Sequence, residues 1–240
     1  MSTTYNLFCL PSAGSSASMY GEWRKNTPEW LKVFPIEYAG HGGRCNESLA
    51  SSTGEIIDDI LQCILSVARE NIILFGHSLG AALAVRLAKK MREIGIEQSV
   101  RLMILSGRPA PSCLQSSQTH PSLWSHEELV NRAKRYGGIP EIILNEPDIL
   151  SFFLRILQSD LCINEELIKE DKVIFSFPIW GMTGEDDYVA PHKSVHQWKE
   201  WTNCWKGVSI FPGGHFFLRD EMSVQQIIEG ISNIVSSFEQ

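Results

Sequence analysis

A serine, a histidine and an aspartate occur in an order that supports nucleophilic acyl chemistry. Ser78 is the centre of a G-x-S-x-G pentapeptide at residues 76–80. An apolar run precedes it, and a run rich in alanine and leucine, typical of a helix, follows it. A sharp turn from strand to helix holds a serine oxygen clear of a sheet, at the positive end of the helix. The pentapeptide also fits a helix N-cap serine in a glycine-rich turn, so its partners decide between the two.

The histidine that fits the role of base is His215. A serine hydroxyl needs an imidazole to take its proton, and His215 lies in a glycine-rich loop at 211–217 that precedes the last predicted helix. His77, beside the serine in sequence, is expected to pack next to the site instead. His192 and His196 have the spacing of a metal-binding pair on a helix, but no third ligand is evident, so we expect no metal.

The carboxylate that orients the base is expected to be Asp187, with Asp186 as the alternative. Both follow the strand predicted at 178–183 and precede a helix predicted to begin near Pro191. The chain order Ser, Asp, His is the order of this chemistry on an α/β fold. The strand predicted at 100–106 is followed by no carboxylate, so the acid comes from the later strand.

An acyl-transfer site also needs two donors for the developing oxyanion. The main-chain N–H of Leu79, directly after the serine, is expected to be one, and the loop at 10–16, after an early strand, is expected to supply the other. That loop lacks the spacing and the lysine of a phosphate-binding P-loop, and the glycines at 39–44 do not form a dinucleotide fingerprint. We therefore expect no cofactor.

Short apolar runs alternate with amphipathic helical stretches along the chain. This pattern predicts an α/β fold with a mostly parallel central sheet flanked by helices, in a single domain over 1–240. The predicted strands are 5–10, 31–37, 71–75, 100–106, 178–183 and 208–211, and the clearest predicted helices are 53–69, 79–94 and 224–238.

One region interrupts this alternation. Residues from about 120 to 172 contain an insertion that is helical throughout from about 125, with Pro140 and Pro147 as expected breaks. Phe152 and Phe153 make it more apolar than one buried face requires. A plain crossover between parallel strands needs only one helix. We therefore expect a helical lid over the carboxyl edge of the sheet.

Composition narrows the class of partner and compartment. The 240 residues carry a net charge of −7 with no basic run, which argues against nucleic acid as a partner. No apolar run reaches the length of a membrane span, and residues 1–10 lack the features of a signal peptide. The six cysteines contain no C-x-x-C pair, so we expect a reducing, cytoplasmic setting.

Taken together, the segments resemble the stand-alone type II thioesterases of nonribosomal peptide and polyketide synthases. The resemblance covers most of the chain, and one departure is Tyr38-Ala39, where the family usually has a proline before the loop at 40–44. The matching segments are 10–20, 40–44, 76–80, 136–140, 148–160, 184–189 and 213–218.

The resemblance implies an α/β-hydrolase fold and release of acyl groups from the phosphopantetheine arm of an acyl or peptidyl carrier protein. It places the second oxyanion donor at Ala13. We expect Phe152, Phe153 and Phe216 to contact the acyl chain. We also expect a monomer that needs no cofactor of its own.

The sequence leaves the partner and the substrate open. Carrier proteins are themselves usually acidic, so docking would depend on apolar contact or on a basic patch that includes Arg44, Arg108 or Lys134. The alternatives are a small-molecule carboxylesterase and a chain-releasing thioesterase of fatty-acid synthesis.

Overall fold

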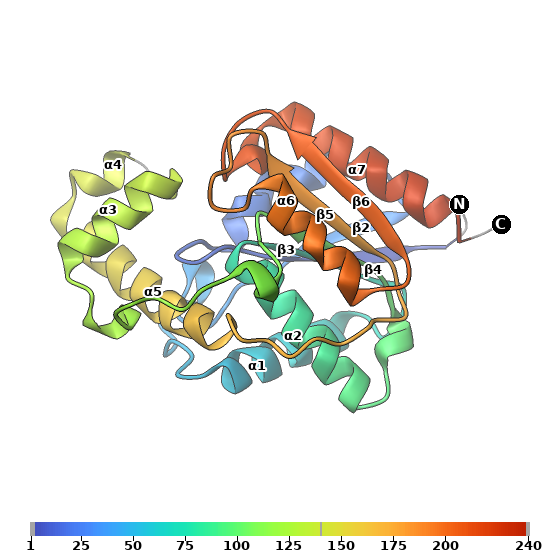
Figure 1. The fold of residues 1–240 in the computed structure, drawn as a ribbon, viewed down its shortest axis with the longest axis horizontal. Coiled ribbons are helices and arrows are strands. Elements are labelled where there is room, and N and C mark those ends of the chain that lie inside the picture. The colour runs from blue at the N-terminus through green and yellow to red at the C-terminus, as the bar shows by residue number, and fades with distance from the viewer. Residues whose placement is uncertain (1–2, 140, 239–240) are drawn as a thin grey trace.

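A six-stranded sheet forms the centre of the molecule, and every neighbouring pair of its strands is parallel (Figure 1). This is a computed structural model that describes residues 3–139 and 141–238. The strand order across the sheet is β2-β1-β3-β4-β5-β6. The strands are β1 Tyr5–Leu10, β2 Leu31–Pro35, β3 Ile72–His77, β4 Val100–Ser106, β5 Ile179–Gly184 and β6 Trp205–Phe211.

The central strands bury side chains on both faces, which explains their continuous apolar runs. In β1, Phe8 and Leu10 belong to one hydrophobic core, whereas Leu7 and Cys9 belong to the other. This alternation follows from the two-residue period of a strand. Each face is therefore covered by its own layer of helices.

The helices divide between the two faces of the sheet (Figure 1). Buried residues of α1 and α2 join one core, and those of η1 and α7 join the other. The α-helices are α1 Thr53–Val67, α2 Leu79–Glu93, α3 His126–Tyr136, α4 Glu141–Leu144, α5 Pro147–Glu166, α6 His192–Val195 and α7 Glu221–Ser236. The 3-10 helices are η1 Ala17–Asn26, η2 Gly42–Arg44, η3 Glu97–Ser99, η4 Pro111–Cys113, η5 Pro121–Leu123, η6 His196–Trp201 and η7 Phe217–Arg219.

The connections after β1 and β3 leave the sheet toward opposite faces. Strand β1 leads into η1 on one face, and β3 leads into α2 on the other. The two strands are neighbours, with Leu10 opposite Gly76 at their carboxyl ends. A crevice opens where adjacent loops of a parallel sheet diverge in this way, and it is the usual ligand site of such sheets.

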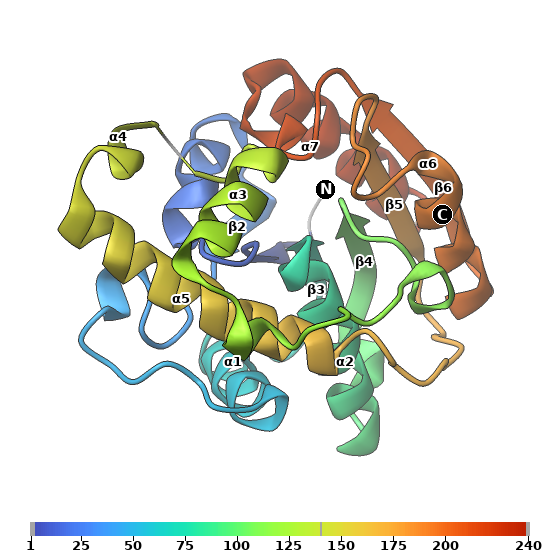
Figure 2. The ribbon, with the colours of Figure 1, turned by 60° about the vertical axis from the view of Figure 1, so that its left-hand side comes forward.

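The insertion between β4 and β5 forms a helical segment at the carboxyl ends of the strands (Figures 1 and 2). It has its own small core, to which α3 and α5 contribute Leu129, Leu154 and Leu157. Helix α5 begins with Pro147 at its first turn, as expected for a proline at a helix start. The other expected break, Pro140, lies outside the described residues.

The predicted elements exist, but several ends differ from the prediction. Strand β6 begins at Trp205, three residues before the predicted start, because this edge strand is only partly buried and lacks a clear apolar run. Helix α7 begins at Glu221 instead of residue 224, because the Asp220 side chain accepts a hydrogen bond from the Ser223 N–H and caps it. Strand β2 ends at Pro35 instead of residue 37.

Candidate active site

Ser78 lies at the junction of β3 and α2 with φ 55° and ψ −111°, a rare backbone conformation for a residue with a side chain. Its N–H donates to the Ser106 carbonyl over 2.8 Å. A Cβ at Gly76 would lie 2.2 Å from the Gly80 carbonyl oxygen, and one at Gly80 would lie 2.1 Å from that of Leu10. The two glycines of the pentapeptide therefore let α2 cross closely over β3 and β1.

His215 and Asp187 form a buried pair. His215 Nδ1 lies 2.8 Å from Asp187 Oδ2, and the two side chains are 5% and 0% exposed. The other carboxylate oxygen, Oδ1, accepts hydrogen bonds from the N–H groups of Val189 and Ala190 at 2.9 and 3.0 Å. The Asp187 carboxylate is thus held in place by its own loop, and its contact with Nδ1 leaves Nε2 as the other ring nitrogen of His215.

Asp186 does not share this position. Its side chain is exposed, whereas its N–H donates to the Gly213 carbonyl. Close contact between the two loops sets this arrangement, because a Cβ at Gly184 would lie 2.3 Å from the Gly214 carbonyl oxygen. Of the two candidate acids, the structure pairs Asp187 with His215.

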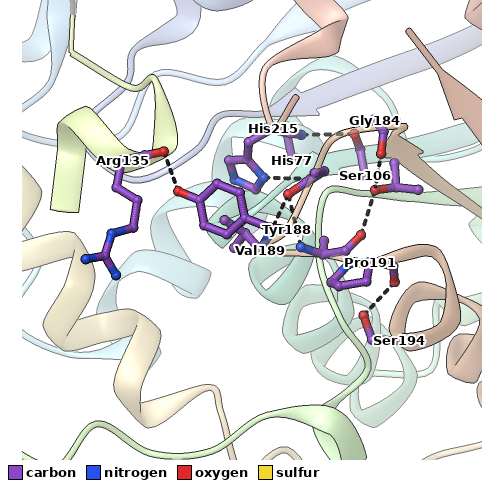
Figure 3. Close-up of polar contacts among 12 residues, drawn as sticks. His77, Ser106, Arg135, Gly184, Tyr188, Val189, Pro191, Ser194 and His215 are labelled. Atoms are coloured by element: carbon purple, nitrogen blue, oxygen red, sulfur yellow. Dashed lines mark hydrogen bonds and ion pairs between the residues drawn. The ribbon is translucent and has the colours of Figure 1, made fainter. Parts of the chain in front are cut away.

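His77 packs beside His215, with the ring centroids 4.9 Å apart (Figure 3). Its Nδ1 lies 2.9 Å from Ser106 Oγ, and the ring is fully buried. Burial, followed by the charges of His215 and Arg219, holds the pKa of His77 well below its usual value. His77 is therefore a neutral neighbour of the base.

Ser78 and His215 line one cavity of about 300 Å³. Leu79 and Ala13, the two expected oxyanion donors, line it as well, and Ala13 lies on the loop after β1. The Tyr38 hydroxyl donates to the Pro11 carbonyl at 3.0 Å and helps to hold that loop. The serine, the imidazole and both loop elements thus meet at one cavity.

The three phenylalanines expected on the acyl chain separate into two groups. Phe153 and Phe216 line the cavity of Ser78. Phe152 is 39% exposed and lines a second cavity of about 410 Å³, which Phe153 also borders. A step of one residue explains this difference, since consecutive residues of a helix such as α5 point about 100° apart. Sequence alone identified the apolar stretch but not which ring lines the cavity of Ser78.

Arg108 is not a surface cation, so its expected place in a docking patch was wrong. It is 6% exposed, lines the cavity of Ser78, and donates from Nη1 to Asn164 Oδ1 of α5. Its Nη2 has no hydrogen-bond partner among the described residues, and burial lowers the pKa of Arg108 to about 10. Arg108 is buried because it follows β4 at the carboxyl edge of the sheet, and α5 covers this edge.

The other two residues of the expected patch differ from each other. Arg44 binds Glu47 and Asp59, with its Nη2 2.6 Å from Glu47 Oε2 and its Nη1 2.7 Å from Asp59 Oδ2. These carboxylates balance its charge locally. Lys134 is exposed in the last turn of α3, on the helical segment.

A second buried histidine–aspartate pair, absent from our sequence-based prediction, lies next to the site. Asp160 of α5 contacts His41 Nε2 at 3.0 Å and the Gly14 N–H at 2.7 Å. The signal was a single carboxylate on an otherwise apolar helix face, at positions 153, 157 and 160. A buried charge in such a place requires a partner.

Other classes of site find no support in the part of the chain that the structure describes. Residues 3–139 and 141–238 contain no group of three or more histidine, cysteine, aspartate or glutamate side chains placed to hold a metal ion. Among the same residues, no helix is both long and apolar enough to cross a membrane.

The parallel sheet, the strained serine between β3 and α2, and a histidine loop after the last strand define an α/β-hydrolase fold. A solved structure supports this class: the thioesterase RedJ of the prodiginine pathway in Streptomyces coelicolor matches with a TM-score of 0.87 at 22% identity, over 97% of this chain and 91% of that one. The family model described as "Thioesterase domain" matches residues 5–235. The chain belongs to the thioesterase domain family, as its sequence motifs predicted.

Two relatives show the range of this family. The gramicidin S biosynthesis protein GrsT of Aneurinibacillus migulanus is 29% identical over 88% of this chain and 82% of its own length. The medium-chain S-acyl fatty acid synthase thioesterase of Rattus norvegicus is 26% identical over 89% of this chain and 81% of its own length.

Proposed function

We propose that this chain is a stand-alone type II thioesterase that frees acyl groups from the phosphopantetheine arm of carrier proteins in a nonribosomal peptide or polyketide synthase. The pairing of His215 with Asp187 beside the strained Ser78 carries the chemistry of the proposal. The relatives support the proposed substrate class, since GrsT is a protein of gramicidin S biosynthesis.

In the proposed reaction, Ser78 Oγ attacks the thioester carbonyl while His215 Nε2 takes its proton. The N–H groups of Leu79 and Ala13 stabilise the oxyanion that forms. Collapse of the tetrahedral intermediate breaks the C–S bond, and the imidazolium returns its proton to the thiolate of the arm. Water, deprotonated by the same imidazole, then hydrolyses the acyl-serine and restores the hydroxyl. No cofactor is required in this scheme.

The helical segment is assigned the role of a lid in this proposal. It supplies Phe153 and Leu157 to the cavity of Ser78 and covers the carboxyl ends of the strands. A cavity of about 300 Å³ suits an acyl group of short or medium length. Within the described residues the six cysteines are free thiols, four of them exposed, which suits the reducing cytoplasm. We further propose that the enzyme acts as a monomer.

A second candidate function is chain release in fatty-acid synthesis, favoured by the similarity to the medium-chain enzyme of Rattus norvegicus. The two functions differ in acyl preference. The type II thioesterase of the first proposal, which edits a synthase by freeing its carrier proteins of acyl groups, accepts acetyl and other short groups. A chain-releasing enzyme prefers one longer chain. A general carboxylesterase would gain nothing from a carrier protein.

The test compares acyl release from acetyl-loaded carrier protein with release from free acetyl-pantetheine, for the wild type and for Ser78→Ala. Faster release from the carrier, abolished in Ser78→Ala, is expected. Equal turnover of the free thioester would favour a general esterase, and a sharp optimum at medium chain length would favour chain release. Undiminished activity in Ser78→Ala would rule out the proposed mechanism.

A further inference from the structure

The loop at residues 11–16, named here the oxyanion loop, is held in the middle by a residue of the helical segment. Asp160 of α5 is 3% exposed, and its Oδ2 accepts a hydrogen bond from the Gly14 N–H at 2.7 Å. Gly14 directly follows Ala13, the expected oxyanion donor. A carboxylate on one structural unit therefore fixes the peptide next to the reacting centre on another.

His41 completes the contact from the main body of the protein. Its Nε2 lies 3.0 Å from the same Asp160 oxygen, and its Nδ1 lies 3.0 Å from the Ala39 carbonyl. A carbonyl and a carboxylate both only accept, so both ring nitrogens carry protons and the ring is an imidazolium. The result is a buried ion pair that spans α5 and the loop before η2.

The environment of His41 agrees with this assignment. Burial acts to lower the pKa of His41, but the hydrogen bond and charge of Asp160, the Ala39 carbonyl and the charge of Glu37 outweigh it, so that the pKa is raised. Tyr38 meets the ring edge-on at 5.5 Å, and Arg219 borders the same second cavity as His41. Asp160 is the carboxylate that directly contacts the His41 ring.

Apolar packing brings the same face of α5 onto the loop. A Cβ placed on Gly14 would lie 3.1 Å from the Phe153 ring and 3.3 Å from Leu157 Cδ1. Ala13 packs against the core of the helical segment and also against the main-body core that α1 and α2 join. The oxyanion loop therefore contacts both of these cores.

The two ends of the oxyanion loop are held differently from its middle. The Tyr20 hydroxyl donates to the Leu10 carbonyl at 2.8 Å, and Glu37 Oε1 accepts from the Ala17 N–H at 2.9 Å. Both of these side chains belong to the main body. The middle of the loop, at Gly14, is bonded to α5 instead.

We propose that Asp160 is a positioning residue that couples the helical segment to the oxyanion hole: the Ala13 N–H is aimed at the reacting carbonyl only when α5 lies over the loop and Asp160 holds Gly14. Closure over the acyl group and completion of the oxyanion hole are then a single event. This inference rests on the proposed function, because it assumes that Ala13 stabilises an oxyanion. It makes hydrolysis inefficient while the segment is open, which protects acyl groups that do not enter fully.

The decisive variant is Asp160→Ala, and Glu166→Ala is its matched control. Glu166 lies on the same helix and also binds a main-chain N–H of the body, with Oε2 3.1 Å from Thr53 N. Both variants remove a carboxylate that ties α5 to the body, but Thr53 begins α1, away from Ala13. Asp160→Asn, which keeps an acceptor for Gly14 and loses the charge, provides a milder change should Asp160→Ala fail to fold.

Three measurements separate positioning from folding. Turnover of a small thioester, butanoyl-N-acetylcysteamine, gives kcat and KM. Titration to completion with a fluorophosphonate counts reactive serines, so kcat is expressed per functional site. Inhibition by an alkyl trifluoromethyl ketone reports on the oxyanion hole itself, because the adduct with the serine carries an oxyanion whichever acyl group the enzyme prefers.

We expect Asp160→Ala to lower kcat per reactive serine by about 10- to 100-fold with little change in KM, and to weaken ketone inhibition by a similar factor. Asp160→Asn should fall between it and the wild type. Glu166→Ala should stay within about 3-fold of the wild type on both readouts while sharing the loss in melting temperature.

The coupling is wrong if Asp160→Ala and Glu166→Ala give the same kcat per reactive serine and the same ketone inhibition, or if only KM changes. Failure of the proposed function has a different signature. In that case the wild type does not cleave the thioester, or Ser78→Ala cleaves it equally well. Protection of the serine from the fluorophosphonate by the ketone needs no thioester turnover, so its comparison between the two carboxylate variants still decides the coupling.

Discussion

Two buried histidine–aspartate pairs lie in or next to the candidate active site, and they differ in whether the imidazole keeps a ring nitrogen free of main-chain and carboxylate partners. His215 contacts Asp187 at 2.8 Å, and His41 contacts Asp160 at 3.0 Å, with all four side chains at most 5% exposed. The first histidine uses one nitrogen for its carboxylate and keeps the other for the cavity.

The second pair uses both imidazole nitrogens for structure, because the Ala39 carbonyl accepts a hydrogen bond from the Nδ1–H of His41. Its carboxylate is shared with the Gly14 N–H, whereas that of Asp187 is completed by N–H groups of its own loop. In the proposed mechanism, similar residues at similar depth thus serve either proton transfer or positioning. The difference depends on the ring nitrogen that does not contact the aspartate: in His41 it is bonded to a main-chain carbonyl, and in His215 it is left for the cavity.

Replacement of each histidine by glutamine should give the largest difference in kcat between the two pairs. His215→Gln removes the base and is expected to lower kcat by about 10⁴-fold or more. His41→Gln retains an N–H donor for Asp160 and should lower kcat by only about 10-fold or less. Steady-state hydrolysis of a small thioester measures both. Comparable losses in the two variants would contradict the division of roles.

The two candidate acids provide the next largest effect. Asp187→Asn should lower kcat by roughly 10³- to 10⁴-fold, because an amide no longer fixes the tautomer of His215. Asp186→Asn should leave kcat within about 2-fold, since its exposed side chain does not contact His215. Kinetics of both variants under one set of conditions tests the assignment, and the reverse order would transfer the role to Asp186.

A pair of glycine variants sharpens the picture of α5 packed on the oxyanion loop. Gly14 and Gly95 have φ of 72° and 78°, but only Gly14 is packed against other side chains. Gly95→Ala should lower the free energy of unfolding by about 1 kcal/mol through backbone strain alone. Gly14→Ala should lose a further ~1 kcal/mol against Phe153 and Leu157. Urea denaturation compares them, and equal losses would mean that α5 moves aside freely.

The smallest expected effect is a pH dependence that belongs to His41. Its pKa is raised in the folded protein, so its contribution to stability is complete below the ordinary value of about 6.5 and is lost as pH rises through the folded pKa. The difference in unfolding free energy between wild type and His41→Gln should therefore shrink from pH 6 toward alkaline pH. Denaturation curves at several pH values measure it; a constant difference would argue against an ion pair.

Much of the fold and half of the site could be predicted because their signals are local. Apolar runs of strand length and amphipathic stretches gave the order of the elements, and the G-x-S-x-G pentapeptide placed Ser78 on a sharp turn. The ends of α7 and β6 were harder to predict, since one depends on the Asp220 cap and the other on a half-buried edge.

The sequence by itself determined the family, the serine at the end of β3 and the histidine loop after β6, because glycine spacing and apolar periodicity specify backbone conformation over a few residues. Only the tertiary structure paired Asp187 and not its neighbour with His215, and only it placed Arg108 in the interior. It also placed Phe153 and not Phe152 on the cavity of Ser78, and it joined Asp160 to Gly14 and His41. Those choices depend on contacts between residues 28 to 146 positions apart in the chain, and no local pattern encodes which surfaces meet over such separations.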